Sequence, residues 1–174
     1  MSALLAQLTG LSATFDIIAV IALFGAGILY GLFAGRNKLI LVIIATYLAL
    51  VISPVLPFAD SFKKGVATDR VFAIDIGIFL GLIIIFYFLI KRSVARSALR
   101  TPRIGDGGFL HIAIFAILAV GLILAYSYSF LSAEMKRQTT PILRRFIFSE
   151  NALFWWTIVP LAGLLLIRKK ETER

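Results

Sequence analysis

The sequence predicts an all-α fold: a polytopic helical membrane protein with four to five transmembrane helices and short amphipathic interfacial helices. Of the 174 residues, 60% are hydrophobic, and the mean hydropathy is +0.98. A soluble domain is typically about 45–50% apolar. The apolar residues fall in runs of fifteen to twenty-three, separated by basic clusters, and about 20 apolar residues span the hydrocarbon core as a helix. We therefore treat residues 1–174 as a single membrane domain.

Five apolar segments are candidate spans: residues 15–35, 39–58, 71–90, 109–131 and 153–167. The second carries Pro54 and Pro57 near its end, where a helix kinks or stops. The fourth follows a turn-like GDGG sequence at 105–108. The fifth contains Pro160, and at 1.5 Å per residue its length reaches about 22 Å. Whether this segment fully crosses the bilayer is left open.

Two connections, residues 57–70 and 141–151, predict short amphipathic helices in the membrane interface. In the first, Phe58, Phe62 and Val66 lie four residues apart, away from the neighbouring lysines. In the second, apolar residues three and four positions apart oppose a pair of arginines. A basic, amphipathic helix of this kind lies along the membrane surface rather than across it.

The distribution of Lys and Arg predicts the orientation. With five crossings, one side collects eleven basic residues, including those of the basic tail at 168–174, and the N-terminal side collects seven. Because basic residues are enriched in cytoplasmic loops, we expect the N-terminus outside and the C-terminus in the cytoplasm. If segment 153–167 does not cross, the count reverses.

The formal net charge of +9 is compatible with two kinds of anionic partner, nucleic acid and membrane lipid. The basic residues lie between hydrophobic runs instead of forming one soluble basic surface. They therefore indicate contact with the lipid bilayer, including its anionic lipids, and no nucleic-acid partner. The chain has no cysteine, which excludes disulfides, thiol catalysis and thiolate metal sites.

The residues needed for catalysis are scarce. The chain has one histidine, His111, and nine acidic residues, without paired carboxylates, metal-ligand spacing or a phosphate-binding glycine loop. An enzyme needs an acid, a base or a nucleophile in a shaped site. The sequence therefore predicts a protein that is not an enzyme and that has no metal or cofactor.

Asp16 and Asp75 lie within apolar runs, where an ionisable side chain is a candidate functional group. Three interpretations remain open for them: carboxylates in a helix N-terminal turn, stabilised by the helix dipole, a proton or ion relay, or a helix–helix contact. Arg70 is a candidate partner of Asp75. His111, near the start of the fourth segment, is interpreted as interfacial or hydrogen-bonded to another helix, with a polar or relay role as the alternative.

Gly27, Gly31 and Gly35 recur every fourth residue in GAGILYGLFAGRNK, on one face of the first predicted helix. Small residues at this spacing let membrane helices approach closely. We expect this face to pack internally, against the second or third segment, with homodimerisation as the alternative.

Four further residues are predicted to mark membrane surfaces. Arg36 and Lys38 follow the first span directly, where basic side chains reach the headgroups. Trp155 and Trp156 match the aromatic belt found at membrane interfaces. For the tryptophans, a binding site is the less favoured alternative.

The stretch FDIIAVIALFGAGILYGLFAGRNKLILVIIATYLALVISPVLP resembles the colicin V production protein (CvpA-like) family. Asp16, Gly31 and Arg36 match the first-span motif of that family, and the later order of a basic connection, a Gly-Asp turn and a Trp-bearing final segment is also similar. The chain departs from the family at RIGDGGFLHI, where spaced glycines are lacking. The resemblance implies a bacterial cytoplasmic (inner) membrane protein linked to colicin V production, a form of toxin biosynthesis, and to envelope homeostasis. It assigns no active-site residues.

Two functions follow. The first is a non-enzymatic membrane protein that supports assembly, secretion or envelope maintenance by helix packing with itself or a membrane partner subunit. The alternative is a small transporter or channel subunit in which Asp16 and Asp75 line a polar path. An intramembrane enzyme is a third, residual hypothesis.

Overall fold

The computed structural model describes residues 2–57, 59–66, 70–92 and 109–172. These residues form helices and the turns between them, and no strand occurs among them. The helices are α1 (Ser2–Ala34), α2 (Arg36–Ile52), a 3₁₀ turn η1 (Ser53–Val55), α3 (Ala59–Lys63), α4 (Val71–Arg92), α6 (Phe109–Ser129), α7 (Ala133–Gln138), α8 (Pro141–Phe146) and α9 (Glu150–Thr172). The predicted turn at 105–108 and residues 173–174 of the predicted tail lie outside the described residues.

Four helical segments are long and apolar enough to cross a membrane: Asp16–Ala34, Arg36–Val55, Val71–Arg92 and Phe109–Ser129. The all-α membrane fold predicted from the sequence is therefore confirmed. The fifth predicted segment lies in α9, whose 23 residues correspond to about 34 Å of helix rise. This helix is longer than the apolar stretch because it also includes polar residues at both ends.

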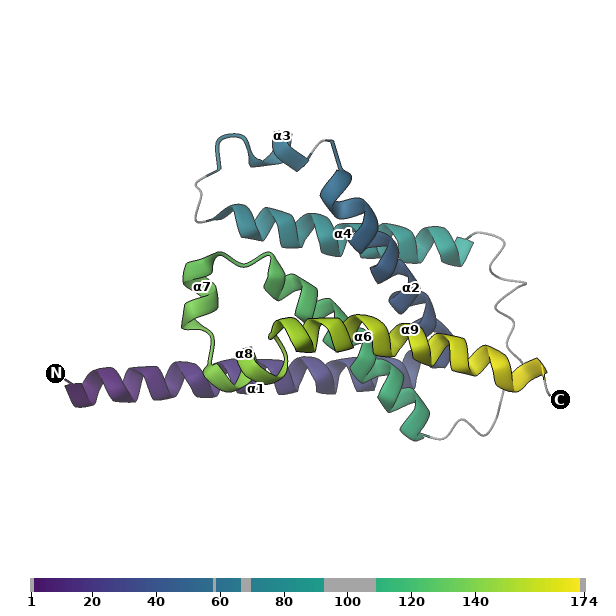
Figure 1. Ribbon diagram of the computed structural model, residues 1–174, viewed down its shortest axis with the longest axis horizontal. Coiled ribbons are helices and arrows are strands. Elements are labelled where there is room, and N and C mark those ends of the chain that lie inside the picture. The colour runs from purple at the N-terminus through teal and green to yellow at the C-terminus, as the bar shows by residue number, and fades with distance from the viewer. Residues whose placement is uncertain (1, 58, 67–69, 93–108, 173–174) are drawn as a thin grey trace.

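The helices run alternately from one end of the molecule to the other (Figure 1). The N-terminus lies at the end where α6 leads into α7 and α8, and α9 carries the chain back to the opposite end. The start of α1 and the end of α9 therefore lie at opposite ends of the helical body. The end that holds the N-terminus, α3, α7 and α8 is called the N-terminal end below.

Helix α2 lies at the centre of the packing and contacts α1, α4 and α6. On one side, Leu39 and Ile43 pack against Phe115 of α6. On the other, alanines of α2 pack against Phe79 and Ile83 of α4. Small buried residues recur in these contacts, which lets the helix backbones approach closely; the buried alanines are Ala45, Ala49, Ala113, Ala116, Ala119 and Ala125.

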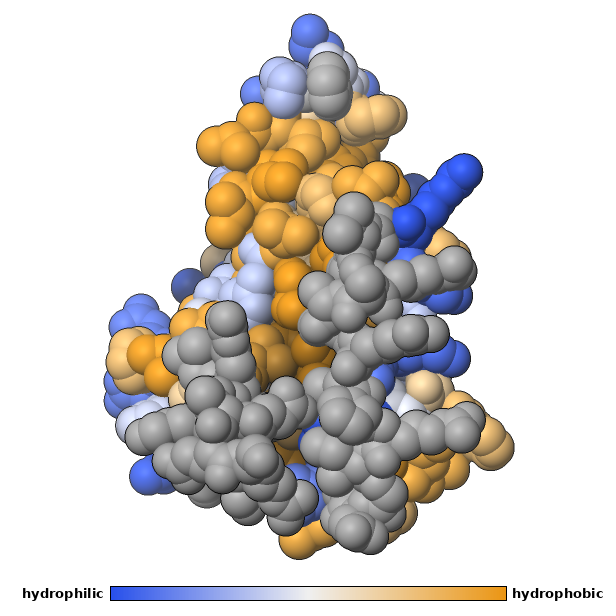
Figure 2. All heavy atoms as spheres, turned by 90° about the vertical axis from the view of Figure 1, so that its right-hand side faces the viewer, coloured by the Kyte–Doolittle hydropathy of each residue, from blue (hydrophilic) through white to orange (hydrophobic). Residues whose placement is uncertain are grey.

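Large hydrophobic side chains cover much of the outer surface, as expected for a body immersed in lipid. Seen from the end at which α4 terminates, they form a broad area over the upper part of the molecule (Figure 2). On α4 the exposed apolar side chains are Leu80, Ile84, Ile85, Phe88 and Leu89. In hydrocarbon such side chains need no protein cover.

The helices extend or divide several of the predicted segments. The first predicted span, 15–35, agrees with the candidate membrane span Asp16–Ala34, and the helix that contains it begins farther out, at Ser2. Among residues 59–66 of the interfacial segment 57–70, the helix is α3, five residues long; residues 58 and 67–69 of that segment lie outside the described residues. The segment 141–151 divides between α8 and the start of α9, because Pro141 starts one helix and a new helix begins at Glu150.

Candidate functional site

Asp16 lies on the half-buried side of α1, well inside a continuous helix. Its Oδ2 atom accepts a hydrogen bond from the backbone N–H of Thr140 at 3.3 Å and another from the Thr140 hydroxyl at 3.1 Å. The interpretation of Asp16 as a carboxylate in a helix N-terminal turn is therefore wrong, because the helix starts fourteen residues earlier. Its role in the structure is to hold the segment that connects α6 to α9.

This connecting segment is held in place by further contacts at the N-terminal end. Thr140 is buried and precedes Pro141, the first residue of α8. The rings of Tyr128 and Phe148 stack with their centroids 4.0 Å apart. The Lys136 ammonium donates a hydrogen bond to the Ser129 carbonyl at 2.7 Å. Together these contacts make the α7–α8 connection an ordered part of the fold.

Asp75 lies in the second turn of α4 and forms an ion pair with Lys63, the last residue of α3. The distance from Lys63 Nζ to Asp75 Oδ1 is 2.7 Å, and the two side chains are 30% and 25% exposed. Arg70, the predicted partner of Asp75, is exposed instead, so that expectation is wrong. The hydrogen bond to Asp75 raises the pKa of Lys63 above its usual value, and the negative charges of Asp75 and Asp60 act in the same direction.

The ion pair lines a pocket of about 240 Å³ at the N-terminal end. The pocket lies between η1, α3 and the first turns of α4, and Phe130, just after α6, forms part of its wall. Its polar lining consists of Ser53, Asp60, Lys63 and Asp75, and its apolar lining consists of Pro54, Leu56, Ala59, Ile78 and Phe130. Asp16 does not line it, so the two aspartates predicted to share a polar path are bound by different elements.

Gly27 and Gly31 form the close contact between α1 and α6. A Cβ atom on Gly27 would lie 2.3 Å from Val120 Cγ2, and one on Gly31 would lie 2.9 Å from Leu39 Cδ1 and 3.2 Å from Ile112 Cγ2. These distances are too short for any side chain larger than hydrogen without movement. The expected packing on the second segment is found at Gly31, whose nearest neighbour is Leu39 of α2, whereas Gly27 packs on the fourth segment, which was not expected.

Gly35 has a different role from the other two glycines. It lies between α1 and α2 with φ 84° and ψ 159°, and a Cβ atom there would meet nothing within 4 Å. Its assignment to the packing face is therefore wrong. This region of backbone space is essentially restricted to glycine, so Gly35 allows the chain to turn between two helices within one residue.

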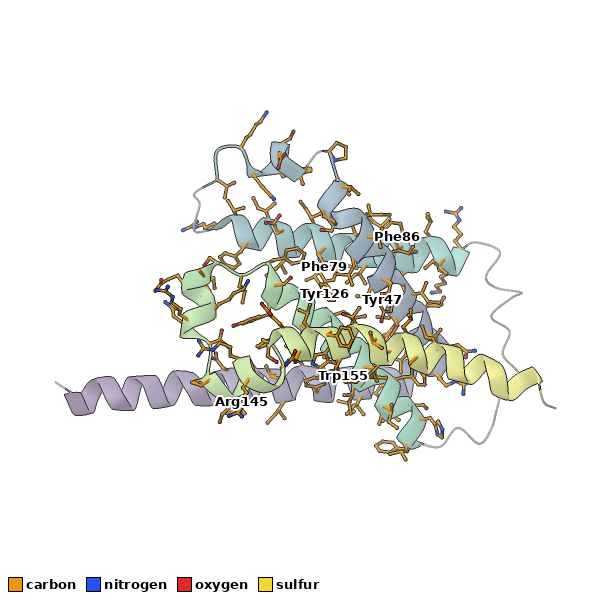
Figure 3. All side chains as sticks on the ribbon, in the orientation of Figure 1. Tyr47, Phe79, Phe86, Tyr126, Arg145 and Trp155 are labelled. Carbon is orange, nitrogen blue, oxygen red and sulfur yellow. The ribbon has the colours of Figure 1, made fainter. Side chains whose placement is uncertain are left out.

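Trp156 packs inside the helical body. A Cβ atom on Gly121 of α6 would lie 2.1 Å from Trp156 Cζ3, and the indole also lies 6.2 Å from the ring of Phe24, centroid to centroid. Its ring fills the space left by a glycine, a packing role that the sequence pattern did not indicate. Trp155 is 60% exposed and points outward from α9 (Figure 3).

The remaining predicted residues lie at the end opposite to the ion pair. Arg36, half-buried, and Lys38, exposed, begin α2 directly after the glycine turn. His111 is exposed in the first turn of α6. These positions place Arg36, Lys38 and His111 apart from both aspartates.

Sequence reasoning missed a polar cluster around Thr157 in α9. The Tyr47 hydroxyl donates a hydrogen bond to the Thr157 carbonyl, and the Tyr126 and Thr157 hydroxyls lie 3.1 Å apart. Figure 3 shows both tyrosines, from α2 and α6, beside α9. A signal for this cluster was present, since tyrosines within apolar segments need a hydroxyl partner when buried. It could not identify that partner.

The described residues offer little free polar chemistry. Every buried side-chain N or O atom among them has a hydrogen-bond partner. No group of three His, Cys, Asp or Glu side chains in the described ranges could hold a metal ion. The pocket at the ion pair combines charged groups, an apolar wall and space for a ligand.

Comparison of the chain with protein-family models, with curated proteins and with solved structures gave no match.

Proposed function

We propose that this chain is a non-enzymatic multi-pass protein of the bacterial inner membrane that supports assembly, secretion or envelope maintenance. It would do so by helix packing with itself or with a membrane partner subunit. We further propose that the chain is related to the CvpA-like proteins that it resembles, and that its N-terminus lies outside the cytoplasm. The passage of α9 to the opposite end of the body supports the five-pass charge count behind that orientation (Figure 1).

One observation carries the packing role. Gly77 and Gly81, four residues apart on α4, have nothing within 4 Å of a Cβ atom built on them. They lie on the face of α4 away from Phe79 and Ile83, which pack against α2. By contrast, Gly27, Gly31 and Gly121 are each covered by a neighbouring side chain.

A face with two such glycines can accept another helix at close range, and the same face on a second copy is complementary to it. A second copy of α4 is therefore the occupant we expect first. We call this face, from Ala73 through Gly77 and Gly81 to Ile84, the open glycine face.

The absence of cysteine makes disulfide crosslinking in membranes a clean test. Ile84→Cys, on the open glycine face and 57% exposed, should give a crosslinked dimer. The matched control Ile21→Cys, 65% exposed on α1, should not. Adding Gly81→Leu should abolish the crosslink without unfolding the monomer, because the position is open.

A crosslink from Ile84→Cys to a different protein would assign the face to a partner subunit. If Ile84→Cys gives neither product, or if Gly81→Leu leaves the crosslink unchanged, the packing proposal fails.

The alternative, a small transporter or channel subunit, has weaker support. Asp16 is bound to Thr140 and Asp75 to Lys63, so the carboxylates do not form one path. A proton flux in reconstituted vesicles that is lost in Asp75→Asn would restore this alternative.

A further inference from the structure

The pocket beside the Lys63–Asp75 ion pair combines charged groups with an apolar wall. We propose that it binds a primary ammonium group of an amphiphile, the ethanolamine headgroup of a membrane phospholipid, between Asp60 and Asp75. This inference is independent of the proposed packing role, which rests on the open glycine face.

The sign of the charge in the pocket selects a cation. Two carboxylates, Asp60 and Asp75, and one ammonium, Lys63, line the space. Lys63 is already paired with Asp75, so the negative charge of Asp60 is not balanced by a second cation among the described lining residues. An anionic headgroup would be repelled by Asp60, whereas an ammonium would complete the charge balance.

Hydrogen-bonding capacity favours a primary ammonium over a quaternary one. Lys63 contacts one oxygen of Asp75, Oδ1, and the second oxygen can accept further hydrogen bonds. The Asp60 carboxylate and the Ser53 hydroxyl line the same space and can also accept. A primary ammonium has three N–H donors for such acceptors. A quaternary ammonium has none and depends instead on several aromatic faces, whereas one aromatic ring, Phe130, lines the pocket among the described residues.

The position and the size of the pocket suit a lipid headgroup. Asp75 lies four residues after Val71, the first residue of the third candidate membrane span, which would place the ion pair close to the level of the headgroups. Leu56, Ile78 and Phe130 supply an apolar wall for the carbon atoms next to the amine. A volume of about 240 Å³ far exceeds the roughly 10–15 Å³ that a cavity needs to hold one water, which leaves room for an ethanolamine group.

The test uses the purified full-length protein in detergent, with lipid retention measured by native mass spectrometry. Phosphatidylethanolamine, phosphatidylcholine and phosphatidylglycerol with the same acyl chains serve as probes. We expect saturable retention of phosphatidylethanolamine at concentrations where the other two lipids are lost. Asp60→Asn should weaken this retention about tenfold or more, because a charge-assisted hydrogen bond is worth about 1.5–3 kcal/mol.

Asp60→Asn leaves the ion pair in place, so its effect does not depend on unfolding of α3. Ala59→Phe, which fills the pocket without changing its charge, should have the same effect. Glu134→Gln is the matched control, since Glu134 is an exposed carboxylate on α7 that does not line the pocket; it should retain the lipid fully.

Free ethylamine is a separate arm of the experiment. Competition by ethylamine only at concentrations far above those of the lipid supports the headgroup assignment. If ethylamine competes at the same concentrations as the lipid, the pocket binds a primary ammonium group but the ligand is not a lipid headgroup. Equal retention of phosphatidylcholine or phosphatidylglycerol, or an unchanged affinity in both Asp60→Asn and Ala59→Phe, overturns the proposal.

Discussion

Asp16 and Thr140, 124 residues apart in the sequence, are joined by two hydrogen bonds to one carboxylate oxygen. This contact ties the first helix to the start of α8 and fixes the path by which the chain returns into α9. A carboxylate inside a membrane helix is costly unless it is bound. Here the bonds come from a buried residue of the connecting segment.

The first prediction concerns this contact. Asp16→Ala should lower the free energy of unfolding by about 1–3 kcal/mol, because it leaves the buried N–H and hydroxyl of Thr140 without this acceptor. Faster hydrogen exchange over residues 133–147, measured in detergent, should accompany the loss. Asp16→Asn keeps an acceptor oxygen and should exchange at nearly the wild-type rate. An unchanged rate in Asp16→Ala would show that the contact does not order the segment.

The second prediction concerns the α1–α6 contact. Gly27→Ala should destabilise the protein by about 1–3 kcal/mol through overpacking, since its Cβ would lie 2.3 Å from Val120. Combining it with Val120→Ala should recover part of the loss, because the clashing methyl groups are removed. Gly77→Ala is the control: that position is open, and alanine is the better helix former. Thermal unfolding of the monomer in detergent separates these outcomes.

The third prediction concerns the turn between α1 and α2. Gly35→Ala should cost about 1–3 kcal/mol, because residues other than glycine are strained at its backbone angles. The cause is conformational and not steric, since the space around Gly35 is open. Gly35→Ser should therefore cost about as much as Gly35→Ala, which the melting temperatures of the two variants can check. A neutral effect of both would mean that the turn adopts another conformation.

The fourth prediction is the pH dependence of the ion pair. The pKa of Lys63 is raised by Asp75 above the ordinary 10.5, so the folded protein holds this proton more tightly than the unfolded chain does. The resulting stability is present in full below 10.5 and is lost as the pH rises through the raised pKa. Exposed pairs contribute about 0–1 kcal/mol, so the effect is small. The difference in melting temperature between wild type and Lys63→Met should stay constant from neutral pH up to 10.5 and shrink above it; a difference that grows there would contradict the sign.

The sequence could predict the helices because each apolar run carries its own membrane signal. It could not predict how they pair. Small residues at four-residue spacing indicate a close approach, but nothing in the pattern of Gly27 and Gly31 identifies Val120, more than eighty residues later, as the neighbour. The same applies to Asp75: the sequence favours the neighbouring Arg70 as its partner, whereas the structure pairs it with Lys63.

Boundary errors have a related physical cause. Asp16 follows the first residue of the apolar run, and a helix that began there would place it in the first turn. Helix α1 instead continues outward to Ser2, because a helix is not limited to the part of its sequence that lipid surrounds. Trp156 shows the same problem for side chains, since tryptophan suits both a membrane interface and the hollow beside Gly121.

The position of α9 has a consequence for how the protein is made. This helix is synthesised after α1, α2, α4 and α6, yet its Trp156 fills the hollow at Gly121 and its Thr157 binds Tyr47 and Tyr126. Before α9 packs against them, that hollow is unfilled and the two tyrosine hydroxyls lack these partners. Folding therefore includes a locking step, in which α9 completes the packing of the helices that precede it in the chain.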